Sequence, residues 1–345
     1  MPKQLPMESF KQSKIKKNSN PYFEHNSNMK SLFLIQNPEL FQGEKYLNTN
    51  KEYFEGWYFK NTNHQEGISF IPGIHINDKT KKAFIQIITN QSSYYINYDI
   101  EDCEFKATPF SVKIGNNTFS KQGIHIAIQE ETQNLKISGD IQYSNSKNIH
   151  TNFIQPNIMG PFSYFSFMEC NHAILSMQNK VEGFMQVNNH KIDFENDVGY
   201  IEKDWGCSFP KSYIWCQGNQ FKKTNASFMI SIADVPLKLF DFRGIICVLK
   251  IEDKEFKFTT YHCAKIVKYE VDKNGLDITL KKGMDELNVK TESHEGIRLA
   301  APVKGRMEKD IFESISANIT VTLKRRNEII FSDISTNCGL EIVLE

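Results

Sequence analysis

Short runs of β-branched and aromatic residues, separated by turn residues, recur along almost the whole chain. Such runs are typical of strands, and many short strands with frequent turns must form a barrel or packed sheets. The sequence therefore predicts an all-β protein. The predicted strands are residues 84–89, 94–100, 110–114, 124–129, 135–143, 181–187, 227–233, 244–251, 255–261, 266–271, 276–281, 318–324, 328–332 and 340–344.

Helical periodicity is scarce, and we expect short helices only at residues 235–242 and 307–314. The strands divide into two β units, at about residues 30–190 and 191–345. Residues 1–29 are rich in Lys, Asn and Ser, which predicts a disordered polar tail. A closed β unit with an apolar mouth would suit a long hydrophobic ligand.

Charge and cysteine content exclude several classes of protein. Lys plus Arg and Asp plus Glu both number 41, so nucleic acid is a poor partner because phosphate binding needs excess cations. The seven cysteines are odd in number and form no CxxC pair, which argues against a disulfide framework and against structural zinc. We expect a reducing, cytoplasmic location, since neither a membrane span nor a signal peptide is recognised.

Cofactor motifs are also absent from the sequence. It has no GxGxxG, phosphate loop, HExxH or GxSxG pattern. A nucleotide, flavin or catalytic zinc mechanism gains no support, so we expect neither a cofactor nor a metal.

Residues 199–221, GYIEKDWGCSFPKSYIWCQGNQF, interleave acidic, amide and aromatic side chains. Side chains alternate between the two faces of a strand, so Glu202 and Asp204 share one face while Lys203 and Trp205 share the other. After a turn at residues 206–210, a second strand presents a mixed aromatic and amide face: Tyr213, Trp215, Gln217, Asn219 and Phe221. A carboxylate among such rings would have a raised pKa and stay protonated near neutrality, as a general acid must.

Residues 53–60, YFEGWYFK, have the same mixed character. Their alternation places Glu55 beside Trp57 and two further aromatic residues on one strand face. A buried carboxylate needs a partner, so Glu55 either takes part in the chemistry or forms a structural ion pair. The arginines that could pair with it are Arg243, Arg298 and Arg306.

Several pieces of the chain resemble the tocopherol cyclase family. They are YFEGWYFK at 53–60, FIPGI at 70–74, MECNH at 168–172, EKDWGCSFP at 202–210, WCQ at 215–217, APVKGRM at 301–307 and TNCGLE at 336–341. The resemblance spans roughly residues 50–345, and the FEGWY and K-x-WG-x-SFP pieces are its most specific parts.

This resemblance implies a fold of two lipocalin-like β units, akin to carotenoid hydratase and AttH-type proteins. It also implies a reaction without a redox cofactor. A hydroxyl of a prenylated quinol adds to the nearest double bond of its isoprenoid tail and closes a chromanol ring. An alkene must then be protonated, aromatic faces would stabilise the carbocation, and a dry cavity would keep water from it.

The residues singled out above suit this chemistry. We predict Asp204 as the general acid, with Glu55 or Glu202 as a second carboxylate. The residues expected to line the cavity are Trp57, Trp205, Tyr213 and Trp215, and those expected to orient the quinol hydroxyls are Gln217, Asn219 and His172.

Alternatives remain open from the sequence. His172 and Asp204 could have structural hydrogen-bonding roles. Because Trp205 alternates with Asp204, both can face one cavity only if a bulge intervenes. A carrier of lipids or isoprenoids would need only an apolar pocket, and a hydratase would need an ordered water beside the acid. A membrane-dissolved substrate would require a peripheral membrane contact, and the oligomeric state stays open.

Overall fold

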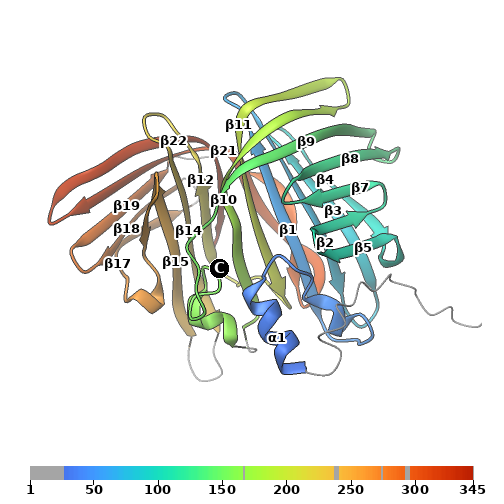
Figure 1. Ribbon diagram of the computed structural model, residues 1–345, viewed down its shortest axis with the longest axis horizontal. Coiled ribbons are helices and arrows are strands. Elements are labelled where there is room, and N and C mark those ends of the chain that lie inside the picture. The colour runs from blue at the N-terminus through green and yellow to red at the C-terminus, as the bar shows by residue number, and fades with distance from the viewer. Residues whose placement is uncertain (1–26, 166–167, 237–240, 273–274, 292–295, 345) are drawn as a thin grey trace, which may run out of the picture.

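The computed structural model describes residues 27–165, 168–236, 241–272, 275–291 and 296–344. Two antiparallel sheets dominate it, and they curl away from each other on either side of a shared interface (Figure 1). The all-β prediction is confirmed, and each sheet builds one β unit.

Sheet A contains the first eleven strands. In spatial order they are β4 (Ser93–Asp99), β3 (Lys81–Thr89), β2 (Gly67–Ile76), β1 (Tyr53–Thr62), β11 (His190–Gly206), β10 (Cys170–Val187), β9 (Leu135–Lys147), β8 (Gly123–Glu130), β7 (Asn117–Ser120), β6 (Phe110–Ile114) and β5 (Cys103–Ala107).

Sheet B contains the remaining strands. Its main path is β16 (Lys254–Lys257), β15 (Asp241–Ile251), β14 (Ala226–Pro236), β12 (Tyr213–Gly218), β22 (Glu328–Val343), β21 (Arg306–Arg325), β19 (Asp285–Thr291), β18 (Gly275–Lys282) and β17 (Lys265–Asp272). The short β13 (Gln220–Phe221) pairs with β22, and β20 (Ile297–Val303) pairs with β21.

The change from one sheet to the other falls between Gly206 and Tyr213. The predicted boundary at residues 190 and 191 lies at the start of β11, and β11 still belongs to sheet A because it pairs with both β1 and β10.

Helices are few in the described part of the chain. The helix α1 (Ser27–Gln36) is accompanied by short 3-10 helices at Gly43–Tyr46, Ile100–Asp102, Gly160–Tyr164 and Thr260–His262. None of the described helices is long and apolar enough to span a membrane. The predicted tail falls mostly on residues 1–26, which lie outside the described residues.

The helix predicted at residues 307–314 is wrong, because these residues belong to β21. There they pair with β20 and β22, and strand pairing outweighs a local helical pattern. Of the helix predicted at residues 235–242, the first two residues end β14 and the last two begin β15. The four between them are outside the described residues.

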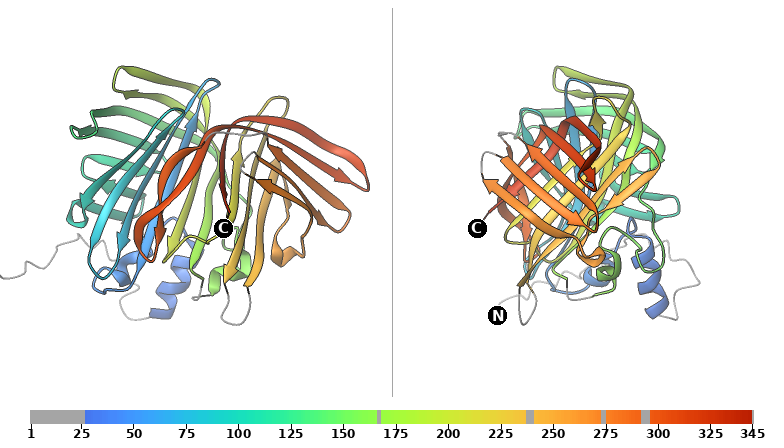
Figure 2. Two further views of the ribbon diagram at one scale, coloured as in Figure 1. Left: turned by 180° about the vertical axis from the view of Figure 1, so that it is seen from behind. Right: turned by 90° about the vertical axis from the view of Figure 1, so that its left-hand side faces the viewer.

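Apolar side chains gather in three layers. One fills the inside of sheet A, one fills the inside of sheet B, and a third lies where the sheets pack together. Because successive side chains of β11 point to opposite faces, this strand contributes to two of these layers. Ile201 packs inside sheet A and Tyr200 packs between the sheets. β20 also lies against sheet A (Figure 2). The Ala300 amide on β20 donates to Gln86 Oε1 on β3 at 2.9 Å.

Candidate active site

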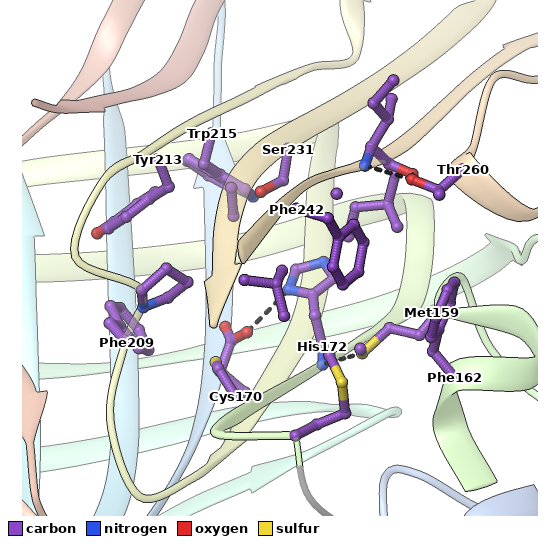
Figure 3. Close-up of a pocket in the computed structure, with 18 of the residues that line it drawn as sticks. Met159, Phe162, Cys170, His172, Phe209, Tyr213, Trp215, Ser231, Phe242 and Thr260 are labelled. Atoms are coloured by element: carbon purple, nitrogen blue, oxygen red, sulfur yellow. Dashed lines mark hydrogen bonds and ion pairs between the residues drawn. The ribbon is translucent and has the colours of Figure 1, made fainter. Parts of the chain in front are cut away.

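A pocket of about 140 Å³ lies at one end of the interface between the sheets. Apolar and aromatic side chains make up much of its wall, and among them Met159 and Phe162 come from the segment that joins β9 to β10 (Figure 3). Three of the predicted site residues, His172, Glu202 and Asp204, enter it from sheet A. An apolar cavity with a few convergent polar groups is the usual form of a small-molecule site.

His172 and Asp204 form a pair at this wall. They occupy partner positions on β10 and β11, and His172 Nδ1 lies 2.8 Å from Asp204 Oδ1 (Figure 3). Burial alone would lower the pKa of His172, but the charge and hydrogen bond of Asp204, together with the acid Glu202, outweigh it and raise the pKa to about 9. His172 is therefore a cation at neutral pH, and Asp204 is its counterion.

Glu202 is the most deeply buried acid of the pocket, with 5% of its surface exposed. Its Oε2 accepts hydrogen bonds from the Tyr200 hydroxyl at 2.6 Å and from Trp215 Nε1 at 3.1 Å, and His172 Nε2 lies 3.5 Å away. Burial raises the pKa of Glu202 to about 8, although positive His172 opposes this rise. At neutral pH the side chain therefore holds its proton.

Sheet B supplies the opposite aromatic wall through Tyr213 and Trp215. Both are buried, and they belong to the apolar layer between the sheets. The Trp215 ring fits against β22 because residue 339 is Gly: a Cβ there would lie 2.5 Å from the ring. The sequence therefore provides an indole directly beside the acid Glu202.

Glu341 also lines the pocket, and the sequence predictions missed it. It pairs with Trp215 across β12 and β22, and its Oε2 accepts a hydrogen bond from the Tyr213 hydroxyl at 2.6 Å. Burial raises the pKa of Glu341 to about 7. The one sequence signal that could have indicated Glu341 is its place in the TNCGLE piece. The structure puts this piece beside the aromatic strand β12.

Glu55, Trp57 and Trp205 are placed elsewhere, inside sheet A. Glu55 is fully buried and pairs with Lys203, whose Nζ lies 2.5 Å from Glu55 Oε1. That ammonium lies over the rings of Trp57 and Trp205, at 4.8 and 4.9 Å from their centroids. The partner of Glu55 is thus this lysine and none of the three arginines considered from the sequence.

Gln217 and Asn219 are buried further along the interface and do not line this pocket. Gln217 Oε1 accepts a hydrogen bond from Lys60 Nζ at 3.0 Å, and Asn219 Nδ2 donates to the Gly199 carbonyl at 3.0 Å. The period-two alternation placed them correctly on the inward face of the segment after Tyr213, but it could not place them along the length of the interface.

The one group of described residues with the spacing of a cation site is His172, Glu202 and Asp204. Their ligand atoms all lie within 4.8 Å of one another. A metal would have to displace the proton of His172, because only neutral imidazole coordinates. The raised pKa of His172 favours the proton at neutral pH.

Comparison with protein families gives one match, and it covers the later part of the chain. The model described as "Tocopherol cyclase-like" matches residues 145–344, which include β10, β11, β12 and β22. The match therefore contains every polar residue of the pocket described above.

Curated relatives match over a shorter length. The tocopherol cyclase of Zea mays is 28% identical over 79 residues, which is 23% of this chain and 17% of that protein. The same figures hold for a protein of Oryza sativa subsp. japonica described as a probable tocopherol cyclase. The match thus spans about a sixth of these relatives.

Solved structures show the fold. The crystal structure of CghA with Sch210972 superimposes with a TM-score of 0.54 at 7% identity, covering 85% of this chain and 89% of that one. The two-unit β architecture is therefore shared with a chain of very different sequence.

Proposed function

Because this chain belongs to the tocopherol cyclase-like family, we propose that it is an intramolecular cyclase that adds a ring hydroxyl to a double bond of an isoprenoid tail. Its substrate would be a prenylated quinol or a similar prenylated phenol, and its product a chromanol-type ring. The buried, protonated Glu202 beside the Trp215 indole carries the proposal.

Proton transfer from Glu202 to the alkene would be the first step. The carboxylate left behind would be stabilised by the Tyr200 hydroxyl, the Trp215 N–H and positive His172. We therefore assign the donor role to Glu202. Asp204, the acid favoured from the sequence, would hold His172 charged and correctly oriented.

A tertiary carbocation would then form next to aromatic rings. Trp215 and Tyr213 line the pocket on the sheet B side, and the faces of such rings attract cations. The largely apolar wall would limit trapping of the cation by water. The hydroxyl oxygen would close the ring by attack on the cation, with loss of its proton.

The direct test is to incubate the purified protein with prenylated quinols in detergent and to follow the products by liquid chromatography and mass spectrometry. Ring closure gives a product of unchanged mass and altered retention time. This product can no longer be oxidised as a quinol. A mass increase of one water would show a hydratase. Unchanged ligand that copurifies with the protein would show a carrier and contradict the proposal.

A further inference from the structure

A second pair of acids lies on the sheet B side of the pocket. Glu313 on β21 and Glu341 on β22 are strand partners, and Glu341 is in turn the partner of Trp215 on β12. Directly paired residues of antiparallel strands project from the same face of a sheet. The three side chains therefore point together into the interface that holds Glu202.

Each of the two acids has a tyrosine donor. The Tyr213 hydroxyl donates to Glu341 Oε2 at 2.6 Å, and the Tyr58 hydroxyl donates to Glu313 Oε1 at 2.5 Å. Glu313 is almost fully buried and does not line the pocket, whereas Glu341 does. Only Glu341 is thus in a position to meet a bound molecule.

The two acids also differ in charge. Burial, together with the neighbouring Glu341, raises the pKa of Glu313 well above its usual range, so Glu313 keeps its proton. Burial raises the pKa of Glu341 only to about 7, so this side chain can accept and release a proton near neutrality.

The other titratable groups that the described residues place around this pair come from sheet A. His172, Glu202 and Asp204 approach the pocket from β10 and β11, and Lys60 lies on β1 beside Tyr58. Burial lowers the pKa of Lys60 to about 8, which leaves it mostly cationic at neutral pH.

We propose that Glu341 is the base of the reaction, accepting the hydrogen bond and then the proton of the substrate's ring hydroxyl. The inference rests on the proposed ring closure and completes its proton balance.

Glu202 gives its proton to the alkene carbon, and a C–H bond forms. The ring oxygen bonds to the cationic carbon while its O–H bond breaks, and that proton goes to Glu341. The free enzyme is restored when a proton passes from Glu341 to Glu202, and no electrons are gained or lost.

A binding experiment tests the contact without relying on turnover. The probes are an alkylhydroquinone with a saturated tail, which cannot cyclise, and its dimethyl ether, both measured by calorimetry. Wild type should bind the hydroquinone at least about tenfold more tightly than the ether. Glu341→Leu should abolish this preference, with Glu341→Ala as the substitute if the Leu variant does not fold.

A turnover experiment tests the proton transfer. Glu341→Gln keeps a hydrogen-bond acceptor but cannot take a proton, so it should keep the binding preference and lose about 100-fold or more in kcat. Glu328→Gln makes the same change at an exposed position of the same strand, β22, and should change both readouts less than about twofold. Circular dichroism and thermal melting check that each variant is folded.

The outcomes separate the two proposals. Glu341 is not the base if wild type binds hydroquinone and ether equally, if the Leu variant keeps the preference, or if the Gln variant turns over like wild type. If wild type cyclises no prenylated quinol but the Leu variant loses the preference, ring closure fails as the function while Glu341 stands as the hydroxyl contact.

Discussion

Glu55 and Glu202 are two buried glutamates on neighbouring strands, and the molecule treats them differently. Their exposed fractions are 0% and 5%, and each accepts a hydrogen bond from a tyrosine two residues earlier, at 2.7 Å from Tyr53 and 2.6 Å from Tyr200. Glu55 has an ammonium at 2.5 Å. Among the described residues, the one ion-pair partner of Glu202 is His172 at 3.5 Å, and Asp204 holds that imidazole more closely.

The comparison teaches that the partner, and not burial, separates a structural carboxylate from a reactive one. Both groups pay a desolvation penalty, which for Glu55 is offset by Lys203 and by the backbone amide of Gln42. Glu202 has no cation of its own and keeps a proton instead. Glu202 and Asp204 face the pocket, and Lys203 between them pairs with Glu55 inside sheet A. One strand therefore supplies both the reactive acid and the cation of the structural pair.

The largest effect should come from Glu202→Gln. This side chain has nearly the shape of the protonated acid but no proton to give, so turnover of a prenylated quinol should fall by about 10²–10⁴-fold. Product formation measured by chromatography against time gives the rate. Glu55→Gln tested in the same assay should lose turnover only in proportion to lost folded protein.

Thermal melting provides the control for Glu202→Gln. Since the native acid is neutral, the amide should leave the melting temperature nearly unchanged at or below pH 4.5, where the unfolded glutamate is largely neutral too. Near pH 7 the amide should raise the melting temperature, because the wild type must take up a proton to fold. Wild-type turnover in this variant would remove Glu202 from the donor role.

The second largest effect should be on stability, through Lys203→Met. The substitution leaves Glu55 buried beside Trp57 without its cation, and loss of one member of a buried pair costs about 3–5 kcal/mol. Lys203 also donates to the Pro38 and Leu40 carbonyls, which lose their partner as well. Chemical denaturation measures the free energy of unfolding, and a loss below about 1 kcal/mol would contradict a structural role.

Much of the fold could be predicted because strand signals are local. Alternation on β11 correctly separated Glu202 and Asp204 from Lys203 and Trp205. The helix predicted at residues 307–314 failed because the pairing of β21 with its neighbours is non-local. The predicted boundary at residues 190 and 191 lies at the start of β11, and the sheet to which β11 belongs depends on its non-local contact with β1.

The site was only partly accessible for the same reason. The sequence pointed to His172 and Asp204 separately, but their pairing depends on the register between β10 and β11. Glu341 lies far along the chain from Trp215, and only the pairing of β12 with β22 brings them together. Glu55 looked reactive because its aromatic neighbours were visible in the sequence, whereas its partner Lys203 comes from another strand.

A smaller effect should appear in the pH dependence of stability. Glu202 has a native pKa of about 8 against an ordinary 4.5, so between these values the native state holds a proton that the unfolded chain releases. His172 acts in the same direction between 6.5 and about 9. The free energy of unfolding should therefore fall as pH rises from about 5 to 8, by at most about 1.4 kcal/mol per pH unit for each group.

Denaturation curves at several pH values check this slope. Glu202→Gln should make it shallower between pH 5 and 7 without removing it, because burial also raises the pKa of Glu341 and of Glu313. An equally steep slope in that variant would mean that Glu202 does not hold its proton in the native state.

The smallest effect should come from Arg243→Met, which sharpens the contrast with Lys203→Met. Arg243 was considered from the sequence as a partner for Glu55, but it binds Asp234 through Nε at 2.9 Å and through its second amino group at 3.2 Å. Both side chains are about 40% exposed, at 44% and 39%. Water solvates either charge once the pair is broken, so the loss should be at most about 1 kcal/mol despite the bidentate geometry.

The same chemical denaturation series measures both variants. If Arg243→Met destabilised the protein as much as Lys203→Met, pairing alone would explain both effects and the argument from burial would fail.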